Sequence, residues 1–376
     1  MNFNYYLPVN LVFGNKKVDE VGTITLKYGR KALLVTGKNS SKKTGLLDRV
    51  IEKLRESGIE SVVFDKVEQN PLTTTAIIGA EFAKEEKCDV IVGVGGGSIM
   101  DCAKAIAFLA CNDGDINEYI YGRKISDKAL PIILIPTTCG TGSEGNGFAV
   151  LTNPENNDKK SLRTNSIIAK ASIIDPECMM TMPKNILASV GFDALTHNME
   201  AYLSKIGQPI TEMMSTYSIS LIGKYFERVY KDDTDMEAWE AMCLASTMGG
   251  MVIHLAGVTL PHGMEHPASG LRNLVHGKGL AALTPVVYEA SIDSAPEKFA
   301  EISRRLGGKD EYDCVDRIQK LLQTINLNVR LSELGIKEND IEWMAENCMK
   351  VSAAGIANHP KLFTRTGIEE LYYGAL

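Results

Sequence analysis

The stretch Pro261–Gly279, PHGMEHPASGLRNLVHGKG, holds three of the six histidines in this 376-residue chain. His262 and His266 are four residues apart, so a helix would place them on one face. His276 follows ten residues after His266, and a bend between them can return it to the same place. The stretch therefore predicts a site made of imidazole groups.

A second segment upstream, GFDALTHNMEAY, places Asp193 and His197 four residues apart. One carboxylate and three imidazoles form a four-ligand set for a divalent ion, made of Asp193, His197, His262 and His276. The set suits Fe²⁺, Zn²⁺, Mn²⁺ or Co²⁺, and no thiolate lies near it in sequence. His266 is then the proton-transfer partner. The alternative, that each histidine is only a satisfied polar group, fits a lone histidine better than four at converging spacings.

The two other histidines, His254 in MVIHLAG and His359 in NHPK, have no such neighbours. We interpret each as a pocket wall or a core residue. Phe148 and Phe363 are further candidates for the substrate pocket, from their position alone.

The composition is that of an ordinary globular protein, with 44% hydrophobic and 23% charged residues, and the chain is long enough for two domains. The net charge of -7 argues against a general nucleic-acid binder. Eight cysteines without a CxxC pair indicate reduced thiols. No signal peptide is seen, and no apolar run approaches the roughly 18 residues of a membrane span. We therefore expect a cytoplasmic protein with no nucleic-acid or membrane partner.

The first half of the chain alternates strands and helices. Buried strands separated by amphipathic helical patterns are predicted at residues 31–36, 61–64, 89–94 and 130–136. Strand, helix, strand, helix and strand in succession form a βαβαβ unit, which predicts a parallel, Rossmann-like sheet. A polar, hairpin-like patch, NPENNDKK, and a further strand, ASIID, follow before Pro176.

Two glycine-rich turns follow predicted strands. The first, Gly95-Gly96-Gly97-Ser98, precedes a helix, whose N-terminus and close backbone approach favour a phosphate. A tight turn that needs positive φ would have the same sequence. The second, TTCGTGSEGNG, lies at the carboxyl end of the strand at 130–136, where open α/β sheets bind ligands. A solvated loop is its alternative.

A rival phosphate site lies at residues 37–44, GKNSSKKT, one residue from the P-loop pattern GxxxxGK[ST]. Lys42 stands where the second glycine is required, and its side chain would obstruct the phosphate cradle. We therefore do not expect a P-loop nucleotide triphosphatase.

From Pro183 onward, stretches with a 3.6-residue period predict helices only. They cover 184–204, 209–230, 236–257, 296–306, 312–326 and 338–354. The expected fold is an α/β dinucleotide-binding domain at residues 1–180, followed by an all-α metal-binding catalytic domain at residues 181–376.

Together these motifs resemble the iron-containing (group III) alcohol dehydrogenases, in their butanol dehydrogenase or aldehyde reductase branch. The resemblance is carried by Val12-Phe13-Gly14, GGGSIMDCAKAIA, IPTTCGTGSE, GFDALTH and PHGMEHP…VHG. It implies a dehydroquinate synthase-like architecture with the active site in the cleft between the domains, and a homodimer formed through the N-terminal domain. It also implies an enzyme that interconverts a primary alcohol and its aldehyde by hydride transfer with NADP(H) or NAD(H).

The resemblance assigns roles to residues at matching positions. The implied ligands of Fe²⁺, or of Zn²⁺ or another divalent ion, are Asp193, His197, His262 and His276. His266 falls at the position that relays protons. The positions implied to contact the cofactor are Gly96, Gly97, Ser98, Asp101, Thr137, Thr138, Ser143, Asn146 and Lys159, with Lys160 as the alternative to Lys159. Gly37, Ser40 and Asn70 are further candidates for cofactor binding.

The choice of cofactor is predicted from the end of the strand at 31–36. Family members that use NAD commonly carry an acid there, which accepts the ribose 2′-hydroxyl. Here Gly37 follows the strand and Lys42 and Lys43 lie beyond, so no carboxylate in this stretch repels a 2′-phosphate. We expect NADP(H) in preference to NAD(H). The alternative is that these lysines only form a solvated helix start.

Three other functions fit parts of the sequence. Glycerol dehydrogenase-like polyol oxidation belongs to the same reaction class. A dehydroquinate synthase-like lyase would retain NAD and a metal, but the basic residues that anchor its phosphate are not found here. A metal or nucleotide sensor would bind nucleotide without turnover.

Overall fold

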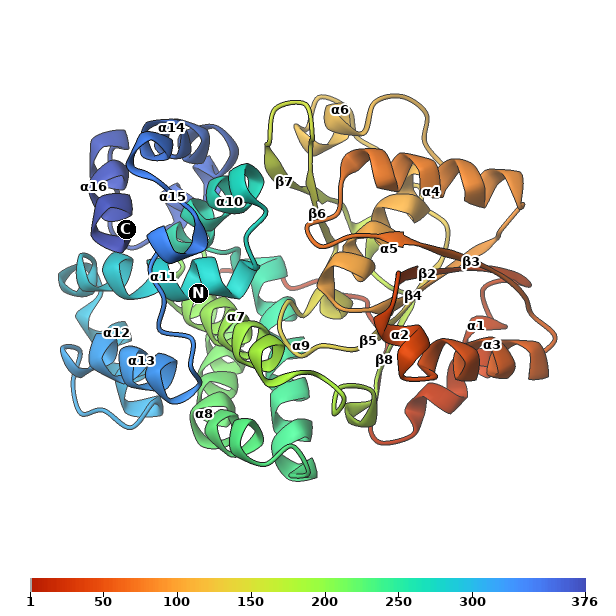
Figure 1. Cartoon of the computed structure of the whole chain (residues 1–376), viewed down its shortest axis with the longest axis horizontal. Helices are drawn as coiled ribbons and strands as arrows, with labels where there is room; N and C mark the ends of the chain where they lie inside the picture. The colour runs from red at the N-terminus through yellow and green to blue at the C-terminus, as the bar shows by residue number, and fades with distance from the viewer. Residues whose placement is uncertain (1) are drawn as a thin grey trace.

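The structure is a computed structural model that describes residues 2–376. Figure 1 shows two regions side by side, a sheet flanked by helices and a region made of helices. The predicted combination of an α/β region with an all-α region is confirmed. The domain boundary near residue 180 stays a prediction. It falls between the 3₁₀ turn Pro176–Cys178 and the first long helix, which begins at Lys184.

The sheet has six strands in the order β1-β8-β5-β4-β2-β3, and every pair is parallel, as predicted. The strands are β1 (Leu11–Phe13), β2 (Lys31–Gly37), β3 (Glu60–Val67), β4 (Val90–Gly95), β5 (Ile132–Pro136) and β8 (Ala171–Ile174). The sequence does not predict β1, because three residues are too few to carry a readable period. All of β4 is buried, as expected for a central strand covered on both faces.

Helices cover both faces of this sheet. Leu33 packs in one core with α4 (Thr73–Glu85) and α5 (Gly97–Leu109), whereas its neighbour Leu34 packs in another core with α3 (Leu46–Glu56). Neighbouring strand residues point to opposite faces, so continuous apolar runs fill two cores. The other helices of this region are short: α1 (Val21–Thr25), α2 (Ser40–Lys43) and α6 (Ile116–Ile120).

An antiparallel hairpin joins β6 (Phe148–Thr152) to β7 (Lys159–Arg163). The polar patch NPENNDKK spans its turn, which confirms the predicted hairpin. Residues of β7 contact the helical region at α10, so the hairpin brings its side chains to the boundary between the two regions.

The helical region contains, within the described residues, α7 (Lys184–Leu203), α8 (Pro209–Lys231), α9 (Met236–Ala256), α10 (Leu260–Arg272), α11 (His276–Glu289), α12 (Pro296–Arg305), α13 (Asp313–Thr324), α14 (Ile341–Val351), α15 (Ala353–Asn358) and α16 (Arg365–Ala375). Six of these helices match the predicted stretches to within a few residues. The sequence does not predict α10 and α11 as continuous helices, because each contains an internal proline, Pro267 or Pro285.

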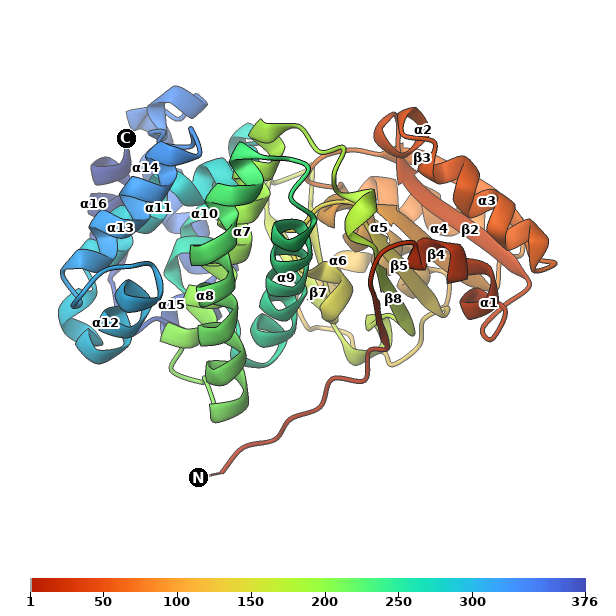
Figure 2. The ribbon, with the colours of Figure 1, turned by 90° about the horizontal axis from the view of Figure 1, so that it is seen from below.

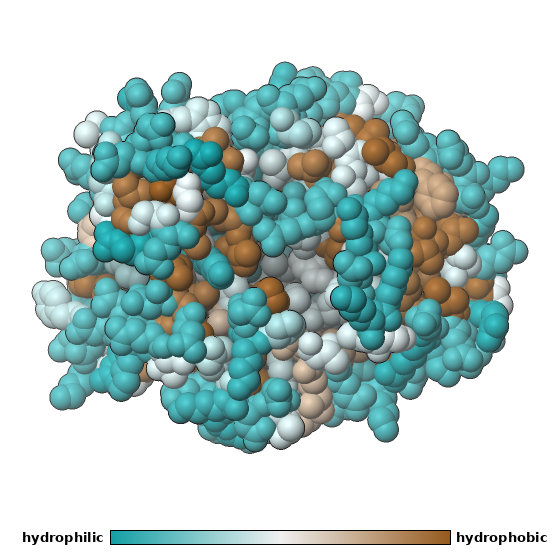
Figure 3. Space-filling view, in the orientation of Figure 1, coloured by the Kyte–Doolittle hydropathy of each residue, from teal (hydrophilic) through white to brown (hydrophobic). Residues whose placement is uncertain are grey.

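Figure 2 shows the segment before β1 extending away from the rest of the chain. Figure 3 shows hydrophilic side chains over much of one face, with a hollow near its centre where the two regions meet. No single described helix is long and apolar enough to cross a membrane. The helices α9 and α10 pass that test only as a pair bent by 102°.

Candidate active site

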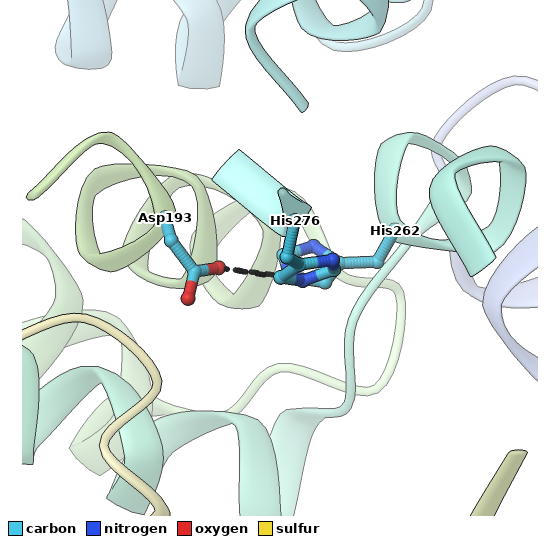
Figure 4. Close-up of side chains that lie close together, drawn as sticks. All are labelled: Asp193, His262 and His276. Atoms are coloured by element: carbon cyan, nitrogen blue, oxygen red, sulfur yellow. Dashed lines mark ion pairs between the residues drawn. The ribbon is translucent and has the colours of Figure 1, made fainter. Parts of the chain in front are cut away.

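The four predicted ligand residues converge at the boundary between the two regions. Oδ1 of Asp193 lies 3.6 Å from Nε2 of His197, 3.4 Å from Nε2 of His262 and 3.6 Å from Nε2 of His276. Figure 4 shows Asp193 facing His262 and His276. Asp193 and His197 share one face of α7, as their spacing predicts. We call these four residues the Asp–His cluster.

A turn between α10 and α11 brings His276 back to His262. Asn273 follows the end of α10 with φ of 50°, a left-handed conformation in which the chain reverses direction. His276 is then the first residue of α11, and its ring lies 5.2 Å from that of His262. The predicted bend is thus present.

The Asp–His cluster has the chemistry and spacing of a metal site. Ligand atoms about 2.1 Å from one tetrahedral ion lie about 3.4 Å from one another, close to the distances found here. Oδ1 of Asp193 and Nε2 of His262 are buried without a hydrogen-bond partner. Ligand atoms of Asp193, His262 and His276 all lie within 4.8 Å of one another. His197 is outside that tighter set, but its Nε2 lies 3.6 Å from Oδ1 of Asp193 and its ring stacks on that of His262, with centroids 4.5 Å apart.

The charge states of Asp193 and His197 favour a cation, whereas at His262 the carboxylates of Glu200 and Asp193 outweigh burial and raise the pKa to about 10, so that an ion must displace a proton from this ring. Burial acts to raise the pKa of Asp193, but the imidazoles of His197, His276 and His262 outweigh it and hold that pKa below its usual range. The carboxylate therefore stays ionised. Burial lowers the pKa of His197 to about 4, so its ring is neutral near pH 7 and keeps a nitrogen lone pair.

Two buried glutamates that the sequence analysis overlooked orient the histidines. Oε1 of Glu200 lies 2.6 Å from Nδ1 of His262, and Glu265 pairs with Nδ1 of His276. A proton on Nδ1 leaves Nε2 of each ring as the free nitrogen that faces Asp193. The sequence carries a signal for both acids: Glu200 follows His197 by three residues on α7, and Glu265 follows His262 by three on α10.

His266 lies beside the cluster and outside its ligand set. Its ring is 6.4 Å from that of His262 and 6.0 Å from that of His276. It is half-buried and lines both the active-site cavity and a second cavity next to it. Burial holds the pKa of His266 well below its usual range. The predicted proton-transfer residue is thus near the cluster and reaches a second space.

A groove leads from the sheet to the Asp–His cluster. It consists of a cavity of about 380 Å³ at the glycine-rich turn and one of about 120 Å³ at the cluster, and six residues line both. The predicted cofactor residues that line one or both are Ser40, Asn70, Gly96, Gly97, Ser98, Asp101, Thr138, Ser143, Asn146 and Lys159. Gly37, which ends β2, and Thr137, whose N–H donates to the carbonyl of Gly95, line neither cavity.

The glycine-rich turn is built for close approach. Gly95, Gly96 and Gly97 do not have positive φ, so the interpretation as a strained tight turn is wrong. Instead, a Cβ on Gly97 would lie 2.3 Å from Cγ2 of Thr141. Gly97 begins α5, whose N-terminus has no side-chain cap, so its backbone N–H groups point to the groove without a capping side chain.

Lys104 braces the loop that carries Ser143 and Asn146. Its buried Nζ donates to the carbonyl of Ser143 at 2.6 Å, to Oδ1 of Asn146 at 3.0 Å and to the carbonyl of Phe148 at 2.8 Å. Asp101 completes the network by accepting from Oγ of Ser143 at 2.5 Å. Burial lowers the pKa of Lys104 to about 8. The sequence analysis did not single out Lys104, because a lysine in a helix is usually solvated.

Two further predicted residues tie the regions together. The amide of Asn70 donates across the groove to Oδ1 of Asn273 at 2.8 Å. Nζ of Lys159 is buried and lies 3.3 Å from Oε2 of Glu265. Lys160 points to the other side of β7, where it donates to the carbonyl of Val351 at 2.8 Å. Lys159, rather than Lys160, lines the active-site cavity.

The end of β2 differs from its sequence-based interpretation in one respect. Lys42 forms an ion pair with Asp65 of β3, so a carboxylate from the next strand lies beside the lysines that follow Gly37. The sequence could not show this contact, which joins residues far apart in the chain.

Of the other residues predicted to line the substrate pocket, some lie at the active-site cavity and some do not. Phe148 lines the active-site cavity, and its ring lies 5.3 Å from that of His254, whose Nδ1 accepts from the N–H of Gly147. His359 is buried against Oγ of Ser291, 2.9 Å away, and neither it nor Phe363 lines that cavity.

The model of the family described as iron-containing alcohol dehydrogenase matches residues 8–176. That of the C-terminal region of the Fe-containing alcohol dehydrogenase family matches residues 187–376. This chain belongs to the iron-containing alcohol dehydrogenase family. It is an oxidoreductase that interconverts an alcohol and its aldehyde with a nicotinamide dinucleotide. The lyase, glycerol dehydrogenase-like and P-loop alternatives are not favoured.

Relatives match along nearly the whole chain. The NAD-dependent methanol dehydrogenase of Bacillus methanolicus is 32% identical, over 99% of this chain and 100% of its own. The 1,3-propanediol dehydrogenase of Klebsiella pneumoniae is 36% identical, over 93% of this chain and 92% of its own. The crystal structure of an archaeal alcohol dehydrogenase from a Red Sea brine pool, bound to NZQ, superposes with a TM-score of 0.96 at 33% identity. It covers 100% of this chain and 99% of its own.

Proposed function

We propose that this enzyme interconverts primary alcohols and aldehydes at the Asp–His cluster, with NADP(H) in preference to NAD(H). The observation that supports this most strongly is the meeting of one carboxylate oxygen and three Nε2 atoms at the end of the cofactor groove. The reaction then takes place where the groove from the sheet reaches the cluster.

Asp193, His197, His262 and His276 would hold Fe²⁺ or another divalent ion. When bound, such an ion acts as a Lewis acid on the oxygen of the substrate. Glu200 and Glu265 act as positioning residues, since they fix which ring nitrogen of His262 and His276 is free. The two acids also keep these rings from rotating.

The groove would bind the dinucleotide. The uncapped N-terminus of α5, with Gly97 and Ser98, would take the pyrophosphate. The loop braced by Lys104 would present Ser143 and Asn146 to the nicotinamide end, which supplies or accepts the hydride. His266 would move the proton of the hydroxyl group toward the second cavity.

Preference for NADP(H) is supported by Gly37 at the end of β2 and by the lysines at positions 38 and 43. The ion pair between Lys42 and Asp65 weighs against it, because Asp65 neutralises one of the three lysines and adds a negative charge. The preference for NADP(H) therefore depends on Lys38 and Lys43.

We also propose a cytoplasmic homodimer. Phe3 and Tyr6 are 43% and 56% exposed on the extended segment before β1, which gives a partner an apolar arm to bind (Figure 2). All eight cysteines are free thiols, as a reducing compartment favours. A sedimentation mass near that of one chain, 41.0 kDa, would contradict the dimer.

The function is tested by metal analysis of the purified protein together with a screen of short aldehydes. We expect bound divalent metal, and loss of absorbance at the reduced nicotinamide band when an aldehyde is added. Each aldehyde is run with NADPH and with NADH, and kcat/KM is expected to be higher with NADPH. Absence of turnover with every aldehyde would refute the function, whereas similar values for the two cofactors would refute only the preference.

A further inference from the structure

A second cavity of about 270 Å³ lies next to the active-site cavity. The two cavities share four lining residues, Ser161, Arg163, Val258 and His266. They therefore adjoin at His266, and a substrate that reaches past this residue from the Asp–His cluster enters the second cavity. The second cavity shares no lining residue with the cavity of about 380 Å³ at the glycine-rich turn, so it is not placed to hold the phosphates of the cofactor.

This second cavity is lined by cations and by no acid. Lys160 and Arg163 are among its thirteen lining residues, and none of the thirteen is Asp or Glu. Both basic residues belong to β7. Within the described chain, neither Lys160 nor Arg163 has a carboxylate oxygen within 4.0 Å, the distance limit for an ion pair. Two positive charges thus face one space without a counter-charge.

The contacts that Arg163 and Lys160 make neutralise their positive charges only weakly. The guanidinium of Arg163 lies over the ring of Phe148, with Cζ 4.5 Å from its centre. Nζ of Lys160 donates to a backbone carbonyl. Burial, and then the charge of Arg163, lower the pKa of Lys160. Asp158 opposes this shift, but it already pairs with Lys350 at 2.7 Å.

A buried hydroxyl on a different element also lacks a partner in this cavity. Ser352 follows α14, lines the cavity and is 8% exposed, and its Oγ has no hydrogen-bond partner. A buried donor left without a partner is unfavourable, so a ligand that accepts its proton is favoured. Lys160, Arg163 and Ser352 together offer donors to one acidic group.

We propose that the second cavity binds an acid group at the far end of the substrate, so that the enzyme prefers short aldehydes that carry a carboxylate or sulfonate. The inference rests on the proposed function, because the reacting carbon must lie at the Asp–His cluster. The redox step is unchanged: hydride from the reduced nicotinamide adds to the aldehyde carbon, and a proton adds to its oxygen. Arg163 and Lys160 determine which aldehyde is selected.

The test compares two four-carbon aldehydes, succinic semialdehyde and butanal, which differ at the far end by a carboxylate. In the metal-loaded enzyme we expect kcat/KM to be at least about tenfold higher for succinic semialdehyde. Arg163→Gln and Lys160→Gln should each lower that ratio by at least about fivefold. Sulfoacetaldehyde is run alongside, and a higher kcat/KM for it than for succinic semialdehyde would identify sulfonate as the preferred acid.

The matched control is Arg123→Gln, which removes a positive charge from an arginine that pairs with Glu118 and does not line the cavity. It should leave the ratio unchanged. Equal values for the two four-carbon aldehydes in the wild type, or an equal fall for both in Arg163→Gln, would overturn the inference while the alcohol dehydrogenase activity stands.

A binding measurement separates the inference from turnover. Succinate has two carboxylates and no reacting group, and calorimetry should detect its binding to the wild type. Binding should be at least about tenfold weaker in Arg163→Gln. If no aldehyde is reduced, the proposed function fails, and equal succinate affinity in the two proteins would then overturn the anion site as well.

Discussion

At the scale of single residues, the site depends on which nitrogen of each histidine is free. Glu200 and Glu265 occupy Nδ1 of His262 and His276, so the Nε2 atoms are left to face Asp193. An imidazole without such a partner has two tautomers, and only one of them presents its lone pair to the cluster. The acids therefore select the nitrogen that can bind a metal ion.

His266→Ala is expected to lower kcat by at least about tenfold, because a positioned proton carrier is lost. Its metal content should be unchanged, since the ring of His266 lies 6.0 Å or more from those of His262 and His276. Steady-state kinetics and metal analysis of the same preparation check both parts.

The comparison for that variant is His262→Ala, which removes Nε2 of His262, one of the four proposed ligand atoms of the Asp–His cluster. Here metal content and kcat should fall together. Loss of metal from His266→Ala as well would place His266 among the ligands.

Residue type and spacing were enough to predict the Asp–His cluster, because aspartate and histidine in helical register leave few other roles. Spacing could not show that Lys104 braces the cofactor loop or that Lys42 meets Asp65. Each of these contacts joins residues more than twenty positions apart, and their pairing exists only once the sheet has formed.

At the scale of elements, periodicity predicted most helices and the central strands, since their apolar runs are long. It failed at α10 and α11, where Pro267 and Pro285 interrupt the pattern. These helices persist because both are largely buried, α10 against α14 and α11 against α7 and α16, so that packing outweighs the low helix propensity of proline.

Packing of α9 against the cofactor loop gives a prediction at this scale. A Cβ on Gly250 would lie 1.8 Å from the carbonyl oxygen of Gly142, so the two backbones touch. Gly250→Ala must push α9 away from the loop that carries Ser143 and Asn146. We expect a loss of about 1–3 kcal/mol in the free energy of unfolding and a higher KM for the nicotinamide cofactor.

Gly367→Ala is the matched control, because this glycine also lies in a helix but its new Cβ would meet only side-chain atoms, the nearest of them Cδ1 of Phe363 at 3.3 Å. Denaturant unfolding and cofactor KM should both stay near the wild-type values. If Gly250→Ala behaves like Gly367→Ala, α9 does not position the loop.

At the scale of the whole molecule, the active site belongs to neither region alone. The sheet region contributes the glycine-rich turn and Lys159, the helical region contributes the cluster, and residues of both line the groove. The amide of Asn70 and the carboxylate of Glu265 make contacts that join the two regions across this boundary. Binding at the cluster should therefore affect the stability of the assembled fold.

Removal of the metal tests this link. The proposed ligands come from α7, α10 and α11, so an ion ties three helices together, and without it Asp193 Oδ1 and His262 Nε2 are buried without partners. A free ion at about 100 times its Kd stabilises the fold by about 2.7 kcal/mol. Such a change shifts Tm by about 3 °C in a chain of this size, so chelation should lower the melting temperature by that amount, as measured by calorimetry. In Asp193→Asn, which weakens the site, chelator should leave Tm unchanged; an equal shift in both proteins would place the stabilising ion elsewhere.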